Sequence, residues 1–392
     1  MDENKKDRLA YYLFNFFIGF YIANGTTILF ARQLGFSFSR IFVLTAVYML
    51  MFVIFEIPTG AFADLAGRKK SIILGTIALA LAALASGSSQ NYTQLFLSFF
   101  IWSLGFSLMS GSAEAMLYDK LGDEQTFQRV YGKAQSLFLV GTALAGILGP
   151  FLYSQNFRFP YLFSAVPFAL AGLAIKFFRE KEAQRPGFTL RSHFEQIKTG
   201  TRLAFHNRYV LWSMAVLSLC FAVAYTFSNS YQPYLTQIGY SVKAFSVILP
   251  VMFLAEAFGG AGSARVRRMF GENGSFWLNI LLVGLALAVL GFFARKEILP
   301  VILLYSFAQG VLRPLVSTYA NRYIDSTHRA TVMSVQMMIG TITAAGFLFL
   351  FGFLTDKLGV IKISALMGGI VLAVGILLLL VKPKNSTEQE AG

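Results

Sequence analysis

Long apolar stretches alternate with short polar segments along nearly the whole 392-residue chain. A membrane-spanning helix needs about 20 apolar residues to cross roughly 30 Å of hydrocarbon. Lipid offers no hydrogen-bond partners to an exposed backbone, so apolar stretches of this length are predicted to be helices. The pattern therefore predicts an all-α integral membrane protein with twelve transmembrane helices, at about 9–30, 41–62, 71–88, 94–118, 130–151, 161–178, 210–235, 244–262, 275–294, 298–319, 331–353 and 361–381.

Composition supports the membrane class. Hydrophobic residues make up 56% of the chain and charged residues only 13%, about half the charged share of an average soluble protein. So few charged side chains would not cover the surface of a soluble protein of this length. The composition thus excludes a soluble enzyme and a disordered chain, and the single cysteine, Cys220, excludes an intrachain disulfide.

The net charge of +14 could indicate a nucleic-acid partner, but the positions of the basic residues indicate membrane topology. If the N-terminus is cytoplasmic, 24 of the 33 lysines and arginines fall on the cytoplasmic side and eight on the other. This asymmetry is typical of membrane proteins. It predicts a multi-pass protein of the cell (plasma or inner) membrane, with both termini cytoplasmic and no nucleic-acid partner.

The longest polar break, Arg179–Arg208, separates six predicted spans from six. Apolar residues recur in it at helical spacing among basic ones, at Leu190, Phe194, Ile197 and Ala204. This pattern predicts a basic amphipathic helix on the inner membrane surface. The predicted organisation is a six-helix bundle over 1–178, a cytoplasmic linker over 179–209, and a second six-helix bundle with a short tail over 210–392.

The two halves repeat one pattern at an offset near 200 residues. Glu56 and Gly60 in the second span match Glu256 and Gly260 in the eighth, and a basic cluster follows each pair. Many secondary transporters are built from two such repeated bundles, which move about a central site. The duplication therefore predicts pseudo-symmetric bundles and a transport function.

The loop after the second span contains a glycine, an aspartate four residues later, and then Gly67-Arg68-Lys69. In this position and spacing it resembles the signature loop of the major facilitator superfamily. The resemblance covers about residues 9–381. It implies a central cavity lined mainly by helices 1, 4, 7 and 10, and alternating access without ATP hydrolysis.

The same loop is predicted to act as a gating latch. The two glycines permit close helix approach and a tight turn, and Asp64 can accept hydrogen bonds at a helix N-terminus and pair with Arg68. Because Ala264 stands where the first half has Asp64, any latch in the second half is expected to be weaker. The predicted latch residues are Gly60, Asp64, Gly67, Arg68, Asp119 and Arg129. Asp119, at the end of the fourth span, is expected to join Arg129 and Arg68 in one cytoplasmic network.

The fifth span partly resembles the glycine-rich motif of the drug:H+ antiporter branch, through Gly141, Gly146 and Gly149-Pro150. In that branch the motif packs helix 5 on helix 8. The chain departs from the branch in the fourth span, where Ile101 stands in place of an arginine four residues before Gly105. Small residues are also common packing devices between membrane helices, so both interpretations of the glycines stay open.

Ionisable residues within spans are costly and are therefore candidates for substrate binding or coupling. The alternative role is snorkelling toward the cytoplasmic interface or pairing that only fixes helix packing, with equal weight for Glu56 and Glu256 and less weight for Glu114 and Arg313. If Glu114 and Arg313 face each other across the cavity, proton and substrate would compete for one site. The predicted substrate and coupling residues are Glu114, Arg313, Asn24, Asn229, Gln232, Gln309, Glu56 and Glu256.

A largely apolar cavity with few charges favours amphipathic ligands. We therefore predict a monomeric, proton-coupled exporter of amphipathic or drug-like small molecules, with no cofactor and no metal. The alternative within the same fold is uptake or export of a specific metabolite, such as a sugar, lysolipid, siderophore or amphipathic acid. A membrane-embedded enzyme or receptor is the alternative from another class, but His193, His206 and His328 lack metal-ligand spacing.

Overall fold

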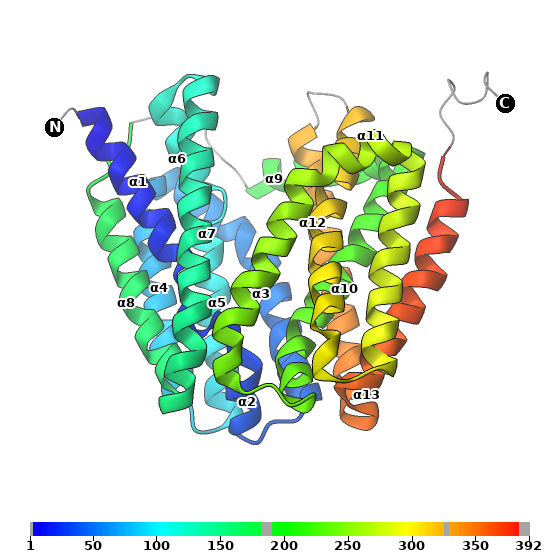
Figure 1. Ribbon diagram of the computed structural model, residues 1–392. Coiled ribbons are helices and arrows are strands. Elements are labelled where there is room, and N and C mark those ends of the chain that lie inside the picture. The colour runs from blue at the N-terminus through cyan, green and yellow to red at the C-terminus, as the bar shows by residue number, and fades with distance from the viewer. Residues whose placement is uncertain (1–2, 182–189, 325–328, 384–392) are drawn as a thin grey trace. The chain divides into compact units, whose positions relative to one another are not determined.

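A computed structural model describes residues 3–181, 190–324 and 329–383, which form helices and no strands (Figure 1). The described residues include nine helices that are long and apolar enough to cross a membrane, and a bent pair of helices near the N-terminus makes a tenth. The predicted all-α integral membrane fold is therefore confirmed.

The chain divides into two compact units. Unit 1 comprises Met1–His193 with Ser241–Pro250, and unit 2 comprises Phe194–Tyr240 with Val251–Gly392.

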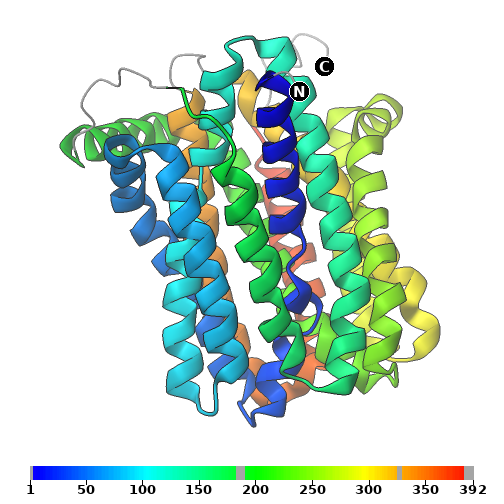
Figure 2. The same cartoon turned by 90° about the vertical axis from the view of Figure 1, so that its left-hand side faces the viewer.

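Unit 1 contains the first six predicted spans. Figure 2 shows α1 lying between α7 and α8, and α8 also contacts α4. The first span is bent where a short 3-10 helix joins α1 to α2. The elements are α1 (Glu3–Gly19), η1 (Ile22–Gly25), α2 (Thr27–Gln33), α3 (Phe38–Ala66), α4 (Arg68–Ser88), α5 (Tyr92–Met109), α6 (Ser112–Leu121), α7 (Glu124–Gln155) and α8 (Phe159–Lys176).

The other elements begin with α9 and, apart from the start of α9, η2 and the start of α11, belong to unit 2. Within unit 2, α10 contacts α12 and α13. The elements after α8 are α9 (Leu190–His206), α10 (Arg208–Gln237), η2 (Val242–Ala244), α11 (Phe245–Phe292), η3 (Lys296–Ile298), α12 (Leu299–Arg322) and α13 (Arg329–Leu380).

Two of these elements are each too long for one membrane crossing. At 1.5 Å per residue, the 48 residues of α11 would extend about 72 Å, more than twice the hydrocarbon thickness. Non-helical backbone at Gly271 in α11 and at Gly359 in α13 breaks each into two helices. Figure 1 shows the chain reversing direction in both. Divided there, the helical segments correspond to the twelve predicted spans.

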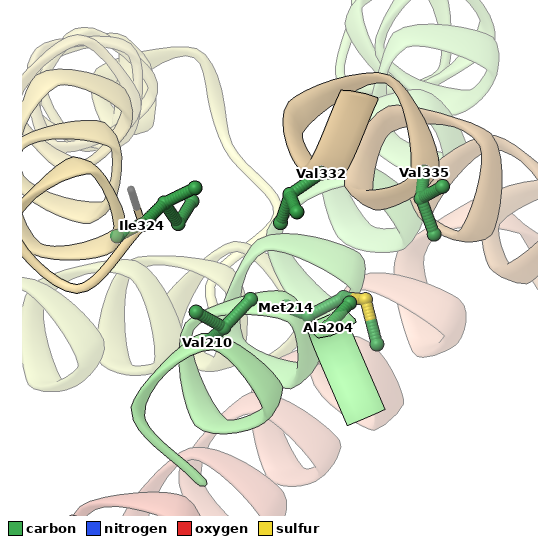
Figure 3. Packing of buried hydrophobic residues seen from close by; sticks show 7 residues of the cluster. Ala204, Val210, Met214, Ile324, Val332 and Val335 are labelled. Atoms are coloured by element: carbon green, nitrogen blue, oxygen red, sulfur yellow. The ribbon is translucent and has the colours of Figure 1, made fainter. Parts of the chain in front are cut away.

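The linker helix α9 packs against other helices of unit 2. Ala204 is fully buried in a cluster with residues of α10, α12 and α13, among them Val210, Met214, Val332 and Val335 (Figure 3). The small side chain of Ala204 fits this helix contact, and the position of α9 on the inner membrane surface stays a prediction. The side chains of Leu190, Phe194 and Ile197 fall outside the described residues.

Candidate functional site

Unit 2 contains a cavity of about 310 Å³ lined by α10, α11 and α12. Most of its lining is aromatic or aliphatic, as in sites that bind ligands with a large apolar part. Three residues that the sequence predicted for binding or coupling, Glu256, Gln309 and Arg313, line it together. The other polar side chains in the lining are Tyr225, Ser228, Tyr231, Tyr305 and Ser306.

Glu256 and Arg313 are the two charged residues of this cavity. They are close enough for Coulombic attraction, but no oxygen–nitrogen distance of 4.0 Å or less joins them. The Arg313 guanidinium carbon lies 5.8 Å from the centre of the Phe221 ring, within range of a cation–π interaction. The cavity thus presents two opposite charges that are near each other without forming a salt bridge.

A close contact between α11 and α12 fixes the position of Glu256. A Cβ atom on Gly310 would overlap the backbone oxygen of Glu256, and one on Gly259 would overlap the backbone oxygen of Phe307. Glycine allows membrane helices to approach this closely. The two glycines therefore bring Glu256 beside the helix that carries Arg313.

The amide residues of unit 2 differ in their relation to the cavity. Gln309 lines it, and its Nε2 donates a hydrogen bond of 2.9 Å to the Tyr305 hydroxyl. Asn229 and Gln232 are buried outside the lining, and Asn229 Nδ2 donates to the backbone oxygen of Tyr225 at 2.8 Å. Gln309 is therefore the amide that a ligand in this cavity would meet.

Unit 1 contains a separate cavity of about 470 Å³, lined by α1, α3, α5, α6 and α7. Glu114 lines it, and its carboxylate accepts a hydrogen bond from the Tyr131 hydroxyl. Asn15 also lines it and donates to the backbone oxygen of Tyr11 at 2.9 Å. The carboxylate of this cavity is thus held by a protein donor.

A helix break positions Glu114. The sequence predicted one span over 94–118, but α5 ends at Met109 and α6 begins at Ser112, with Gly111 in the left-handed region at φ 67°. Glycine adopts this conformation without a steric penalty. Glu114 consequently lies in the first turn of α6, where the helix dipole stabilises a carboxylate. The run Ser110-Gly111-Ser112 is the sequence signal that could have revealed the break.

Two other predicted site residues of unit 1 lie outside its cavity lining. Glu56 accepts a hydrogen bond of 3.3 Å from the Ser110 hydroxyl, and Asn24 lies in η1. The hypothesis that Glu114 faces Arg313 joins residues of different units and stays a prediction.

The predicted latch of unit 1 centres on Arg68, the first residue of α4. Its Nη1 lies 2.7 Å from Asp119 Oδ2, so the predicted contact between these residues is present. Gly67 ends α3 at φ 102°, which confirms its role in a tight turn. A Cβ atom on Gly60 would meet no described atom of unit 1 within 4 Å, so the predicted close helix approach there is wrong within this unit.

Glu180, which sequence reasoning missed, binds the N-terminus of α4. Its Oε1 accepts from the Arg68 backbone at 2.9 Å and its Oε2 from the Lys69 backbone at 3.2 Å. The first N–H groups of a helix lack partners within the helix, and this carboxylate satisfies two of them. The sequence predicted Asp64 in this role. No local signal links Glu180 to a helix that begins 112 residues earlier.

Arg129 does not join this network. It is exposed on α7 and forms no ion pair among the described residues, so its predicted link to Asp119 is wrong. Lys120 instead connects α6 to α1 through an ion pair of 2.9 Å with Asp7. Asp7 also accepts a hydrogen bond of 2.9 Å from the Arg179 backbone.

Unit 2 has an ion cluster at the turn where Gly271, at φ 67°, separates the two helices of α11. The Glu272 carboxylate lies 2.8 Å from Arg322, 3.2 Å from Lys382 and 3.3 Å from Arg267. The sequence predicted a weaker latch in this half because Ala264 replaces Asp64. That expectation missed Glu272, which has three basic partners.

Glu272 lies at the turn, outside the predicted spans 244–262 and 275–294. Burial would raise the pKa of its carboxyl, but Lys382 and Arg322 outweigh burial and hold the pKa below its usual value. These partners lie 110 and 50 residues further along the chain, so the sequence alone did not indicate the cluster.

The glycines of the fifth span have a packing role within unit 1. Cβ atoms on Gly141 and Gly149 would overlap backbone oxygens of Phe16 in α1 and Ile22 in η1. Only Gly146 faces the start of α11, where Leu249 would lie 3.7 Å from an added Cβ. Close packing of α7 on the first span therefore accounts for two of the three glycines.

Comparison with known proteins gives one family. A profile described as Major Facilitator Superfamily matches residues 9–346. The uncharacterized MFS-type transporter YxaM of Bacillus subtilis (strain 168) is 24% identical over 368 residues, which cover 91% of this chain and 90% of YxaM.

Solved structures with similar folds include transporters of different substrates. The nucleoside transporter NupG has a TM-score of 0.78 at 11% identity and covers 98% of this chain and 100% of its own. A D-xylose-proton symporter has a TM-score of 0.73 at 14% identity, with coverage of 97% and 98%. At these identities the likeness shows a shared fold.

Proposed function

Because this chain belongs to the Major Facilitator Superfamily and is an MFS-type transporter, we propose that it exports amphipathic small molecules in exchange for entering protons. Transport proceeds by alternating access, without a cofactor or a metal. The protein acts as a monomer in the cell membrane, with both termini in the cytoplasm, as the distribution of basic residues predicts.

The observation that carries this proposal is the lining of the unit 2 cavity. It combines aromatic and aliphatic side chains with a small number of polar groups and two charges. Such a surface favours a ligand with a large apolar part and a few polar groups, because each buried polar group of the ligand needs a partner.

Carboxylates within the spans provide the proposed proton sites. Glu114 in unit 1 and Glu256 in unit 2 each line a cavity, where a change of protonation can alter ligand binding. Glu56 is the third candidate. In the proposed cycle, Asp64 and the Arg68–Asp119 pair bias the equilibrium between two transporter conformations.

Transport of one specific metabolite is the second candidate function. NupG and the D-xylose-proton symporter have this fold and carry polar metabolites. Gln309 and Tyr305 offer hydrogen-bonding groups in the unit 2 cavity. These observations favour a hydroxylated substrate as the alternative.

Transport by the purified protein in proteoliposomes tests both candidates. With a pH gradient imposed, we expect uptake of a lipophilic dye into vesicles whose interior is acidic, and no such flux of xylose or uridine. Glu114→Gln should reduce the pH-driven flux, whereas Glu124→Gln, an exposed substitution in the first turn of α7, should leave it unchanged. Flux of xylose or uridine without flux of the dye would overturn the proposal in favour of the alternative.

A further inference from the structure

The cavity of unit 2 presents opposite charges to one apolar space. Glu256 reaches it from α11 and Arg313 from α12. Among the described residues, no hydrogen bond or salt bridge engages the Glu256 carboxylate, and the Arg313 guanidinium contacts the face of Phe221. Charges inside a membrane protein are costly unless they are paired or hydrated. A ligand that supplies a counter-charge to each of them would therefore be stabilised.

We propose that this cavity binds a zwitterionic amphipathic molecule, with its cationic group on Glu256 and its anionic group on Arg313. This inference rests on the proposed function, because it names the class of amphipathic substrate. A purely cationic ligand would neutralise Glu256 but would be repelled by Arg313. A purely anionic ligand would neutralise Arg313 but would be repelled by Glu256. A zwitterion pairs with both residues and leaves no net charge in the cavity.

The apolar part of such a ligand has an aromatic surface to contact. Phe227 and Tyr305 lie with ring centroids 4.4 Å apart, and Phe221 and Tyr225 are stacked at 6.0 Å, all in the lining. The volume of about 310 Å³ is near the lower end of the range for small-molecule sites, roughly 300–1,000 Å³. The cavity therefore suits a ligand with one fused two-ring aromatic system and a short charged chain.

Three indole compounds separate the contribution of each charge. Tryptophan carries both charges, tryptamine carries only the cation, and indole-3-propionate carries only the anion. Binding of radiolabelled tryptophan to protein in nanodiscs, with the other two compounds as competitors, measures their relative affinities. We expect tryptophan to bind at least about tenfold more tightly than either of the others, as for one hydrogen bond to a charged group.

Substitutions of the two residues should change this order in different ways. Glu256→Gln should remove the advantage of tryptophan over indole-3-propionate, whereas Arg313→Gln should remove its advantage over tryptamine. Matched controls are Glu297→Gln and Arg295→Gln, which neutralise exposed residues of unit 2 outside the cavity lining. Thermal unfolding of every variant separates a loss of binding from a loss of folding.

The single cysteine of the chain reports where the ligand binds. Cys220 lines the same cavity, so bound tryptophan should slow its alkylation by N-ethylmaleimide, measured as a mass increase of the intact protein. In Cys220→Ala the mass increase should be absent. Protection of Cys220 that is lost in Glu256→Gln and Arg313→Gln would locate the probe at these charges.

The results distinguish this inference from the proposed function. Equal affinity for the three indole compounds, or no binding of tryptophan at millimolar concentration, would overturn the zwitterion site even if dye export is observed. The expected charge preference without any pH-driven dye flux would retain the site and overturn proton-driven export. Binding that leaves Cys220 equally reactive would overturn the assignment to this cavity.

Discussion

Two turns, one in each unit, are followed by helices whose first residues have opposite charges. After the α3–α4 turn of unit 1, α4 begins with Arg68, and after the turn within α11 of unit 2, the second helix begins with Glu272. Each first residue forms an ion pair with the last turn of a neighbouring helix, Arg68 with Asp119 at 2.7 Å and Glu272 with Arg322 at 2.8 Å. The two units thus share the ion-pair arrangement with its polarity reversed.

The difference shows that each unit places both an ion pair and a carboxylate at this helix N-terminus, unit 2 with one residue and unit 1 with two. A helix N-terminus favours a carboxylate because of its dipole and its unsatisfied N–H groups. In unit 2, Glu272 combines a carboxylate at this position with the ion pair. In unit 1, Arg68 forms the ion pair, and Glu180 supplies the carboxylate that accepts from the backbone.

The largest stability effect is expected from Glu272→Gln. The substitution leaves Arg267, Arg322 and Lys382 around a neutral amide, so their mutual repulsion is no longer compensated. Glu272 is partly buried, with 18% of its side chain exposed, and breaking this network should cost about 2 kcal/mol. Thermal unfolding of the purified protein in detergent measures the loss. Glu297→Gln, at an exposed position of the same unit, is the control and should have no measurable effect.

The stabilisation by Glu272 should depend on pH. Its pKa is lower in the folded protein than the usual glutamate value, so the stabilisation is present above the unfolded pKa of about 4.3 and is lost as pH falls through the folded pKa. The unfolding temperatures of wild type and Glu272→Gln should therefore converge in acid. A constant difference down to pH 3 would contradict this role for the carboxylate.

Asp64 has no acidic counterpart in unit 2, where Arg268 stands at the same distance, three residues, before the turn glycine Gly271. If Asp64 biases a two-state equilibrium, Asp64→Asn should reduce transport about tenfold, equivalent to about 1.4 kcal/mol, with unchanged unfolding temperature. Transport into proteoliposomes measures the effect. Asp123→Asn is the matched control, because asparagine caps a helix as well as aspartate. Wild-type transport by Asp64→Asn would remove its proposed role.

The reversed polarity of unit 2 suggests that the charges of the Arg68–Asp119 pair can be exchanged. Arg68→Glu or Asp119→Arg alone should each cost about 1 kcal/mol, since both side chains are partly exposed. The double variant should recover at least half of the combined loss in thermal unfolding. The corresponding exchange of Glu272 and Arg322 should show no recovery, because Lys382 and Arg267 would surround a third cation. Equal recovery in both units would show that the polarity is arbitrary.

The sequence predicted the membrane fold well because the bilayer constrains each span separately. Apolar length reveals a span whatever its neighbours are, whereas a break inside a span depends on local backbone conformation. The break at Gly111 and the 3-10 segment Ile22–Gly25 therefore went unrecognised, although they position Glu114 and Asn24.

Residue matching between the halves failed at the turns for a geometric reason. Glu56 and Glu256 are 200 positions apart, but the turn glycines Gly67 and Gly271 are 204 apart, so unit 2 has about one extra helical turn between them. An offset of 200 positions aligned Arg68 with Arg268, which lies before the turn at Gly271, and therefore missed Glu272, which lies after it.

The candidate site could be predicted only in part. Glu256, Gln309 and Arg313 stood out because ionisable and amide groups are rare in apolar spans, and the structure brings these three residues to one cavity. The cavity itself, and contacts such as the one from Glu180 to the α4 backbone, depend on tertiary packing. No local pattern encodes them.

The smallest effect is expected from Glu180→Gln, and its dependence on residue 68 tests the comparison of the units most directly. Glutamine can still accept hydrogen bonds from the α4 backbone but loses the charge that favours the helix dipole, so the cost should be about 0.5 kcal/mol. In the double variant Arg68→Glu/Asp119→Arg, a carboxylate already lies at the start of α4, as Glu272 does in unit 2. Glu180→Gln should then have no cost, because that carboxylate supplies the missing charge. Thermal unfolding of the four combinations gives the coupling free energy. An equal loss in both backgrounds would mean that Glu180 stabilises unit 1 through contacts other than the helix N-terminus.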